Sequence, residues 1–327
     1  MAQFEKMRPI GGFFELEAHS RASGILYHEN ALALSTGRGC ISYIIRAETP
    51  SKFHIPSYAC ASIHDPLKAQ NIATAFYEID ESLEPVELPT LMPGEFFLYI
   101  NYFGLKRKYI RDLFKIYGDK LIIDNTHDFF ARGFQGNYSF NSARKFFGVP
   151  DGAFLYGDKC QGDKSNLARF SQSDSTPNAL RLAEDYEAAY IAYQTYEKSL
   201  NCEVSLISVE SEQILKAIDY DQVRKIRLAN FQFMHDILGK QNTFRIDQTQ
   251  DFDPFCYPFL PRTGIDIKFF HQRKFFVPSL WRDVIDRELK ASVFETRLCN
   301  DLLPFPIDHR YSKDDLGQIV ELVLKLL

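Results

Sequence analysis

Residues 95–125 read EFFLYINYFGLKRKYIRDLFKIYGDKLIIDN. Within this stretch, Glu95–Asn101 and Lys120–Asn125 are nearly continuous apolar runs that each end in a polar residue. Such runs are typical of strands in a parallel sheet that is covered on both faces. Between them, Arg107–Tyr117 places its apolar side chains at helical spacing. A strand, a helix and a second strand of these lengths predict a βαβ unit with a right-handed crossover.

Short apolar runs continue to alternate with amphipathic stretches on both sides of this unit. Further strands are expected at Lys52–Pro56, Ala73–Tyr77 and Gly152–Tyr156. A helix is expected over Ser57–Gln70, ended or bent by Pro66 because proline lacks the amide that a helix needs. The pattern predicts an α/β fold with a large domain, whose mostly parallel sheet is covered by helices.

The second half of the chain changes character. Ala179–Leu200 and Glu203–Leu238 are helical by composition, whereas the tail is rich in Pro and Phe. Cys256–Leu260 and Ile265–Ile267 resemble strands, and Asp314–Leu327 has the pattern of an amphipathic helix. These segments predict a smaller α+β C-terminal domain.

Length and composition narrow the class of protein. A chain of 327 residues suits about two domains, and we place them at 1–220 and 221–327. The formal net charge of −5 argues against a nucleic-acid partner bound through bulk charge. The sequence lacks a signal-peptide pattern and a transmembrane run, which predicts a cytoplasmic protein without a membrane partner. Cys60 and His64 alone offer too few ligands for a metal, so no metal site is expected.

A first candidate cluster lies at Ser35–Cys40, where Gly37 and Gly39 flank Arg38 at the start of an apolar helix. Backbone amides and the helix dipole favour an anion at such a place, and phosphate is the natural ligand. The alternative is an ordinary turn before a helix.

A second cluster follows the strand at Lys120–Asn125. Asp124 ends a buried apolar run, where a carboxylate has to be paired or hydrogen-bonded to stay charged. A protonated heterocyclic nitrogen would be a suitable partner; a helix cap or a salt bridge is the alternative. His127 could reach the same ligand, or it could be a hydrogen-bonded structural histidine.

A third cluster precedes the strand at Gly152–Tyr156. Lys145 is followed by two phenylalanines, and apolar surroundings lower the pKa of a lysine and make it a nucleophilic amine. Such an amine can bond covalently to an aldehyde. Ser142 offers a hydroxyl to an anion. An isolated lysine would otherwise be a solvated surface charge.

Together, a phosphate cradle, a buried aspartate and a reactive lysine are the three groups that hold pyridoxal phosphate. Their order resembles that of fold-type-I pyridoxal-phosphate enzymes, the aspartate-aminotransferase-like fold. More closely, the chain resembles the DegT/DnrJ/EryC1/StrS family of sugar aminotransferases. The stretches that carry the resemblance are LSTGRGCISYII (34–45), IPSYACASI (55–63), INYFG (100–104), IIDNTHDFF (122–130), SFNSARKFFGVPDGAFLY (139–156) and FPIDHRYSKDDLGQIVELV (305–323).

The resemblance implies roles for individual residues. Lys145 would be the catalytic lysine that bonds to the cofactor. Asp124 would meet the ring nitrogen, and His127 the side of the ring that carries its oxygen. The phosphate would lie on the turn at Gly37, with the amides of Arg38 and Gly39 as its donors.

Two positions depart from the family pattern. Ser139 and Ser142 lie six and three residues before Lys145, which is not the usual spacing, and we choose Ser142 as the phosphate ligand. Cys60 falls near the slot of the aromatic residue that stacks on the ring, and we choose the neighbouring Tyr58 for that role.

The resemblance also implies an activity. An amino acid, with glutamate as the expected donor, would give its amino group to a keto sugar, expected to be nucleotide-linked, in surface-polysaccharide or amino-sugar biosynthesis. A homodimer is implied, with the site near the subunit interface. His271, Arg273, Lys274 and Trp281 are candidates for contacts to the sugar nucleotide. The alternatives are another pyridoxal-phosphate reaction, or a non-catalytic scaffold or regulatory binding protein.

Overall fold

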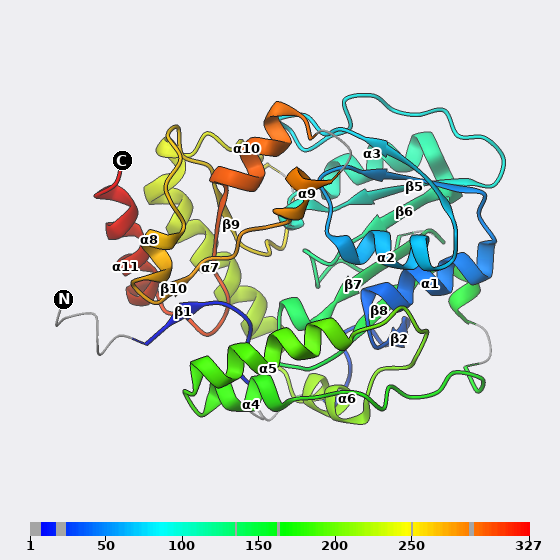
Figure 1. The fold of residues 1–327 in the computed structure, drawn as a ribbon, viewed down its shortest axis with the longest axis horizontal. Helices are drawn as coiled ribbons and strands as arrows, with labels where there is room; N and C mark the ends of the chain where they lie inside the picture. The colour runs from blue at the N-terminus through cyan, green and yellow to red at the C-terminus, as the bar shows by residue number, and fades with distance from the viewer. Residues whose placement is uncertain (1–7, 18–23, 135, 162–163, 250, 288–290) are drawn as a thin grey trace.

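A central sheet of seven strands organises the computed structural model, which describes residues 8–17, 24–134, 136–161, 164–249, 251–287 and 291–327 (Figure 1). The strand order is β2-β8-β7-β6-β5-β3-β4. The strands are β2 (Leu32–Leu34), β3 (Lys52–Pro56), β4 (Ala73–Tyr77), β5 (Glu95–Ile100), β6 (Leu121–Asp124), β7 (Tyr138–Ser142) and β8 (Ala153–Tyr156).

Five neighbouring strands, from β4 to β7, run parallel, and β8 runs antiparallel to both of its neighbours. This confirms the expected mostly parallel α/β sheet. Every residue of β5 and of β6 is buried, which is why these strands read as continuous apolar runs. Strands β2 and β7 are not among the predicted strands, because β2 has three residues and β7 reads as the polar YSFNS.

Helices cover the sheet and extend beyond it (Figure 1). They are α1 (Gly37–Glu48), α2 (Ala61–Ala69), α3 (Arg107–Tyr117), α4 (Thr176–Leu182), α5 (Tyr186–Ser199), α6 (Val209–Lys216) and α7 (Tyr220–Leu238). Of these, α3 has the predicted bounds. The stretch Ala179–Leu200, expected to be helical, holds parts of two helices, α4 and α5, because the chain turns at Glu184, whose φ is +63°. Pro66 does not end α2, which continues for three residues to Ala69.

The C-terminal part of the chain carries two small sheets. One pairs β9 (Tyr257–Phe259) with β11 (Leu303–Phe305) in antiparallel fashion. The other pairs β1 (Ile10–Gly11) with β10 (Phe275–Phe276) in parallel, so the start of the described chain joins this part. Helix α7 packs on α11 (Lys313–Leu324), and the two lie side by side near the C-terminus in Figure 1. The domain division at residue 220 stays a prediction.

The strand expected at Ile265–Ile267 is wrong. This segment leads into the short helix α8 (Lys268–His271), and the side chain of Asp266 accepts a hydrogen bond from the amide of Lys268 at 2.9 Å. That bond starts a helical turn where a strand would need an extended backbone. Two further helices follow, α9 (Asp283–Asp286) and α10 (Val293–Asp301). Among the described helices, none is long and apolar enough to cross a bilayer.

A sharp turn after β5 brings the C-terminal part against the sheet. Gly104 has a φ of +74°, and a Cβ built on it would lie 2.3 Å from the carbonyl oxygen of Asp253 and 2.7 Å from that of His127. Only glycine accommodates both the left-handed backbone and this close approach. The turn therefore sets the distance between the strand ends and the segment around Asp253.

Candidate active site

A cavity of about 270 Å³ opens where β6 and β7 end and α1 begins. Asp124 is the last residue of β6 and Ser142 the last residue of β7, and both line it. Ligands bind in open parallel sheets at this edge, beyond the carboxyl ends of the strands. Gly37, Arg38 and Lys145 line the same cavity, whereas three other predicted residues do not. Those three are Gly39, Tyr58 and His127.

The start of α1 shows which backbone amides can receive an anion. Thr36 is the N-cap of the helix, and its hydroxyl accepts a hydrogen bond from the amide of Gly39 at 3.0 Å. The amides of Gly37 and Arg38 have no acceptor among the described residues. Of the predicted donor pair, the amide of Arg38 is therefore open, whereas that of Gly39 is already bonded to Thr36. Gly39 instead gives α1 room, because a Cβ on it would lie 3.0 Å from the carbonyl oxygen of Glu203.

Thr126 contacts both Lys145 and Asp124, the two residues that are expected to act on the cofactor ring. The amino group of Lys145 donates a hydrogen bond to the hydroxyl of Thr126 at 2.9 Å. The backbone amide of Thr126 donates to Oδ1 of Asp124 at 2.8 Å. One residue thereby orients both the amine and the carboxylate toward the cavity.

Burial shifts the pKa values of this pair in opposite directions. It raises the pKa of Asp124, an effect that the charge of Lys145 and the hydrogen bonds from Thr126 oppose. It lowers the pKa of Lys145, an effect that the charge of Asp124 opposes. A lowered pKa increases the fraction of Lys145 present as the nucleophilic amine at neutral pH.

The segment after β3 places Cys60, and not Tyr58, on the cavity wall. Tyr58 is fully buried and packs edge-on against Trp281 with a centroid distance of 4.7 Å. Cys60 immediately precedes α2 and lines the cavity together with Ser62 and Ile63. The choice of Tyr58 as the ring-stacking residue therefore does not fit the cavity, because its side chain points into the core.

His127 packs behind the cavity wall and does not itself line the cavity. Its ring lies nearly parallel to those of Phe255 (4.5 Å, 10°) and Trp281 (5.4 Å, 11°), and Nδ1 accepts the amide of Phe103 at 3.3 Å. Burial, and then the charge of Lys145, lowers the pKa of His127 well below its usual value, so the ring is neutral. The structure places it against Trp281, which does line the cavity.

Ser139 and Ser142 take different places, although both belong to β7. The hydroxyl of Ser139 is buried and has no hydrogen-bond partner among the described residues, and Ser139 does not line the cavity. Ser142 does line it. Of the two candidates for a phosphate contact, the geometry favours Ser142.

Sequence reasoning missed several residues of the wall. Thr126 and Arg144 directly precede the predicted site residues His127 and Lys145 and could have been found by that position. A further group comes from α5, about 50 residues further along the chain, and only its helical spacing hinted at a shared face. This group is Tyr193, Tyr196 and Glu197.

The cluster predicted in the tail is not brought together at the cavity. Trp281 lines it, whereas His271 bonds the carbonyl of Val277 at 2.7 Å and Arg273 lies over the ring of Phe269 at 3.7 Å. Lys274 is not among the residues that line the cavity.

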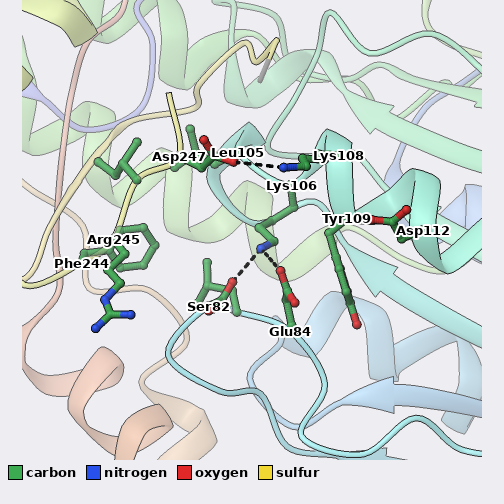
Figure 2. A pocket seen from close by; sticks show the side chains of 12 residues that line it. Ser82, Glu84, Leu105, Lys106, Lys108, Tyr109, Asp112, Phe244, Arg245 and Asp247 are labelled. Atoms are coloured by element: carbon green, nitrogen blue, oxygen red, sulfur yellow. Dashed lines mark hydrogen bonds and ion pairs between the residues drawn. The ribbon is translucent and has the colours of Figure 1, made fainter. Parts of the chain in front are cut away.

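A second cavity, of about 610 Å³, lies between α3 and the segment 244–247 (Figure 2). Figure 2 shows that its lysines face acidic partners: Lys106 bonds Glu84 at 2.5 Å, and Lys108 lies 4.0 Å from Asp247. It contains none of the residues of the three sequence clusters. In the described part of the chain, no group of three or more His, Cys, Asp or Glu side chains is arranged to hold a metal ion.

Comparisons with known proteins identify the fold. No protein-family model matches the sequence, and no curated protein matches it significantly. The solved structure of sugar aminotransferase CalS13 from Micromonospora echinospora is 13% identical and matches over 91% of this chain and 88% of its own, with a TM-score of 0.63. DesV from S. venezuelae is 14% identical over 99% and 92%, with a TM-score of 0.65.

A DegT DnrJ EryC1 StrS aminotransferase from Brucella abortus is 13% identical over 90% of this chain and 85% of its own, with a TM-score of 0.63. The chain therefore has the fold of these aminotransferases, which confirms the predicted fold-type-I class. At this level of identity the likeness concerns the fold.

Proposed function

We propose that this protein is a pyridoxal-phosphate-dependent aminotransferase that transfers an amino group from an amino acid to a keto sugar. The observation that carries the proposal is the convergence of Lys145, Asp124 and the open amides of Gly37 and Arg38 on one cavity. These groups come from three separate segments of the chain. If Lys145 were only a surface charge, or Asp124 only a helix cap, neither residue would need the other groups in the same cavity.

The residues fit the cofactor group by group. The amides of Gly37 and Arg38, at the positive end of α1, suit a phosphate monoester, and Ser142 offers a hydroxyl beside them. Asp124 is buried, so its carboxylate needs a cationic or hydrogen-bonding partner such as a protonated ring nitrogen. Lys145 is the amine that would bond to an aldehyde carbon.

The side chains have definable tasks in amino transfer. Pyridoxal phosphate, when bound, supplies an electron sink for the bonds at the substrate carbon. Asp124 would keep the ring nitrogen protonated and so hold a positive charge where electrons collect. The free amino group of Lys145 would take the proton from the substrate carbon as a base and would donate it on the cofactor side of the amino nitrogen as an acid. Thr126 accepts a hydrogen bond from the amino group of Lys145 and so positions it for this task.

The choice of substrates draws on the neighbours in structure. CalS13 is described as a sugar aminotransferase, and DesI was solved in the presence of its TDP-sugar product. A further neighbour from Streptococcus pneumoniae, a putative sugar aminotransferase, was solved in its PMP-form. The TDP-sugar product of DesI supports a nucleotide-linked keto sugar as the acceptor in this proposal. Glutamate as donor, a homodimer and a role in amino-sugar or polysaccharide biosynthesis complete the proposal.

The test begins with spectroscopy of the purified chain mixed with pyridoxal phosphate. We expect a visible absorption band that borohydride removes, and that is absent in Lys145→Ala. Lys325→Ala, an exposed lysine at the end of α11, is the matched control and should retain the band. Glutamate should then change the band, and a nucleotide-linked keto sugar should restore it. A protein that forms no band would contradict the proposal and favour a non-catalytic scaffold.

A further inference from the structure

Arg144 is the residue directly before the reactive lysine, and it lines the same cavity. Its guanidinium donates through Nη2 to Oε1 of Glu197 on α5. Nε is buried and has no hydrogen-bond partner among the described residues. The guanidinium also lies 5.4 Å from the centroid of the Tyr196 ring. Of the five N–H donors of this arginine, the described hydrogen bonds use one.

Glu197 faces the cavity together with Arg144. Its side chain is 32% exposed, and that of Arg144 is 19% exposed. Both side chains of the pair are therefore partly buried and partly accessible to solvent. A carboxylate that enters the cavity offers Arg144 the same bond that Glu197 provides, with two oxygens for the unused donors.

We infer that Arg144 is a carboxylate-binding residue of the substrate site and that Glu197 is its internal substitute when no substrate carboxylate is present. This inference rests on the proposed function, because it assigns a substrate group to the same cavity. A donor such as glutamate carries a carboxylate next to the reacting carbon, whereas the sugar ring of a nucleotide-linked keto sugar carries no charge there. The Arg144–Glu197 pair lets one cavity accept both in turn: Glu197 neutralises Arg144 while the uncharged sugar ring is bound.

The carboxylate could belong to the amino donor or to an acidic sugar. Both would meet Arg144 through the same chemistry, so the experiment has to separate them. A purely structural role for the pair, as a link between α5 and the lysine segment, makes a different prediction. In that case, loss of either partner would loosen the site and weaken every ligand.

The test uses the protein loaded with pyridoxal phosphate, and glutarate as an unreactive dicarboxylate probe in calorimetric titrations. Arg144→Met should weaken glutarate binding by about 10- to 100-fold, the range expected for a lost charge-assisted hydrogen bond. Arg144→Lys should lose less. Glu197→Gln should strengthen binding by about fivefold, because it removes the competing carboxylate. Glutaramide, the uncharged analogue, should bind the four proteins alike.

Two half-reactions identify the source of the carboxylate. If Arg144→Met raises the KM for glutamate and leaves that for a keto sugar without a carboxylate unchanged, the donor is the ligand. If it raises only the KM for a carboxylate-bearing keto sugar, the acceptor is. Glutarate affinity within twofold of wild type in Arg144→Met, or weaker binding in Glu197→Gln, would overturn the inference. Absence of the visible band from all proteins would instead reject the proposed function.

Discussion

Lys145 and Thr126 are joined by a 2.9 Å hydrogen bond from the amino group to the hydroxyl, although 19 residues separate them in the chain. Thr126 also donates its backbone amide to Asp124. The amine and the carboxylate of the site thus share one anchor, which comes from the turn after β6. Their relative position depends on that turn rather than on either residue alone.

Replacement of Thr126 by valine tests this anchor. The hydroxyl accepts a hydrogen bond from the charged ammonium form, so its loss should lower the pKa of Lys145 further. The measurement is the pH dependence of the rate at which the visible band forms with pyridoxal phosphate. The rate should rise at lower pH in Thr126→Val than in wild type.

Thr126→Ser keeps the hydroxyl and serves as the control, with the wild-type pH midpoint. A midpoint in Thr126→Val that equals or exceeds that of wild type would show that the hydrogen bond does not stabilise the charged amine.

Cys60 should report on occupancy of the cavity. Four cysteines are buried, whereas Cys60 and Cys202 are partly accessible. In a Cys202→Ser variant we expect a thiol reagent to modify one cysteine of the native protein quickly, and mass spectrometry to locate the label at Cys60. Pyridoxal phosphate should slow this reaction several-fold, since Cys60 lines the cavity.

The matched control is Cys60→Ser with Cys202 present, whose labelling rate should not depend on pyridoxal phosphate. Equal labelling of Cys60 with and without saturating pyridoxal phosphate would mean that the cofactor binds elsewhere.

Gly104→Ala should destabilise the protein by about 2 to 4 kcal/mol. The added Cβ would meet two carbonyl oxygens at 2.3 and 2.7 Å, on a backbone with a positive φ. Urea denaturation gives the free energy of unfolding. Gly317→Ala is the control: Gly317 lies inside α11 with no atom within 4 Å of the added Cβ, and alanine there should stabilise by about 0.5 to 1 kcal/mol. Two variants of equal stability would contradict this account.

Asp308 should contribute to stability in a pH-dependent way. Burial tends to raise its pKa, but the bond from Arg310 Nε at 2.7 Å and the other charge interactions lower it to about 2. A lowered carboxyl pKa stabilises the folded state above the unfolded value of about 3.9, and this stability is lost as the pH falls toward 2.

Asp308→Asn should therefore lower the free energy of unfolding by about 2 kcal/mol at pH 7, and by less at pH 3. Urea denaturation of both proteins at pH 7, 4 and 3 measures the difference. Asp314→Asn, an exposed residue in the first turn of α11, should show a smaller effect at pH 7. A difference for Asp308 that stays constant down to pH 3 would exclude the Arg310 pair as its cause.

Much of the central sheet could be predicted because its signals are local. The apolar runs of β5 and β6 and the helical spacing of α3 each lie within a dozen residues, and burial on both faces of a strand leaves a direct trace in composition. Strand β7 could not be recognised, because it carries the polar residues of the site and reads as a loop. The segment at Ile265–Ile267 has strand-like composition, but the side chain of Asp266 starts a helical turn there.

The features of the candidate site also fall into two groups: those that local sequence predicts, and those that depend on packing between elements. The order of a glycine turn, a strand-end aspartate and a lysine can be recognised in the chain, because each lies beside a local element. Packing between elements sets which amides of α1 stay open, that Cys60 rather than Tyr58 lines the cavity, and that Glu197 faces Arg144. Capping bonds, side-chain directions and contacts over some 50 residues depend on packing between elements, and periodicity within one element carries no information about them.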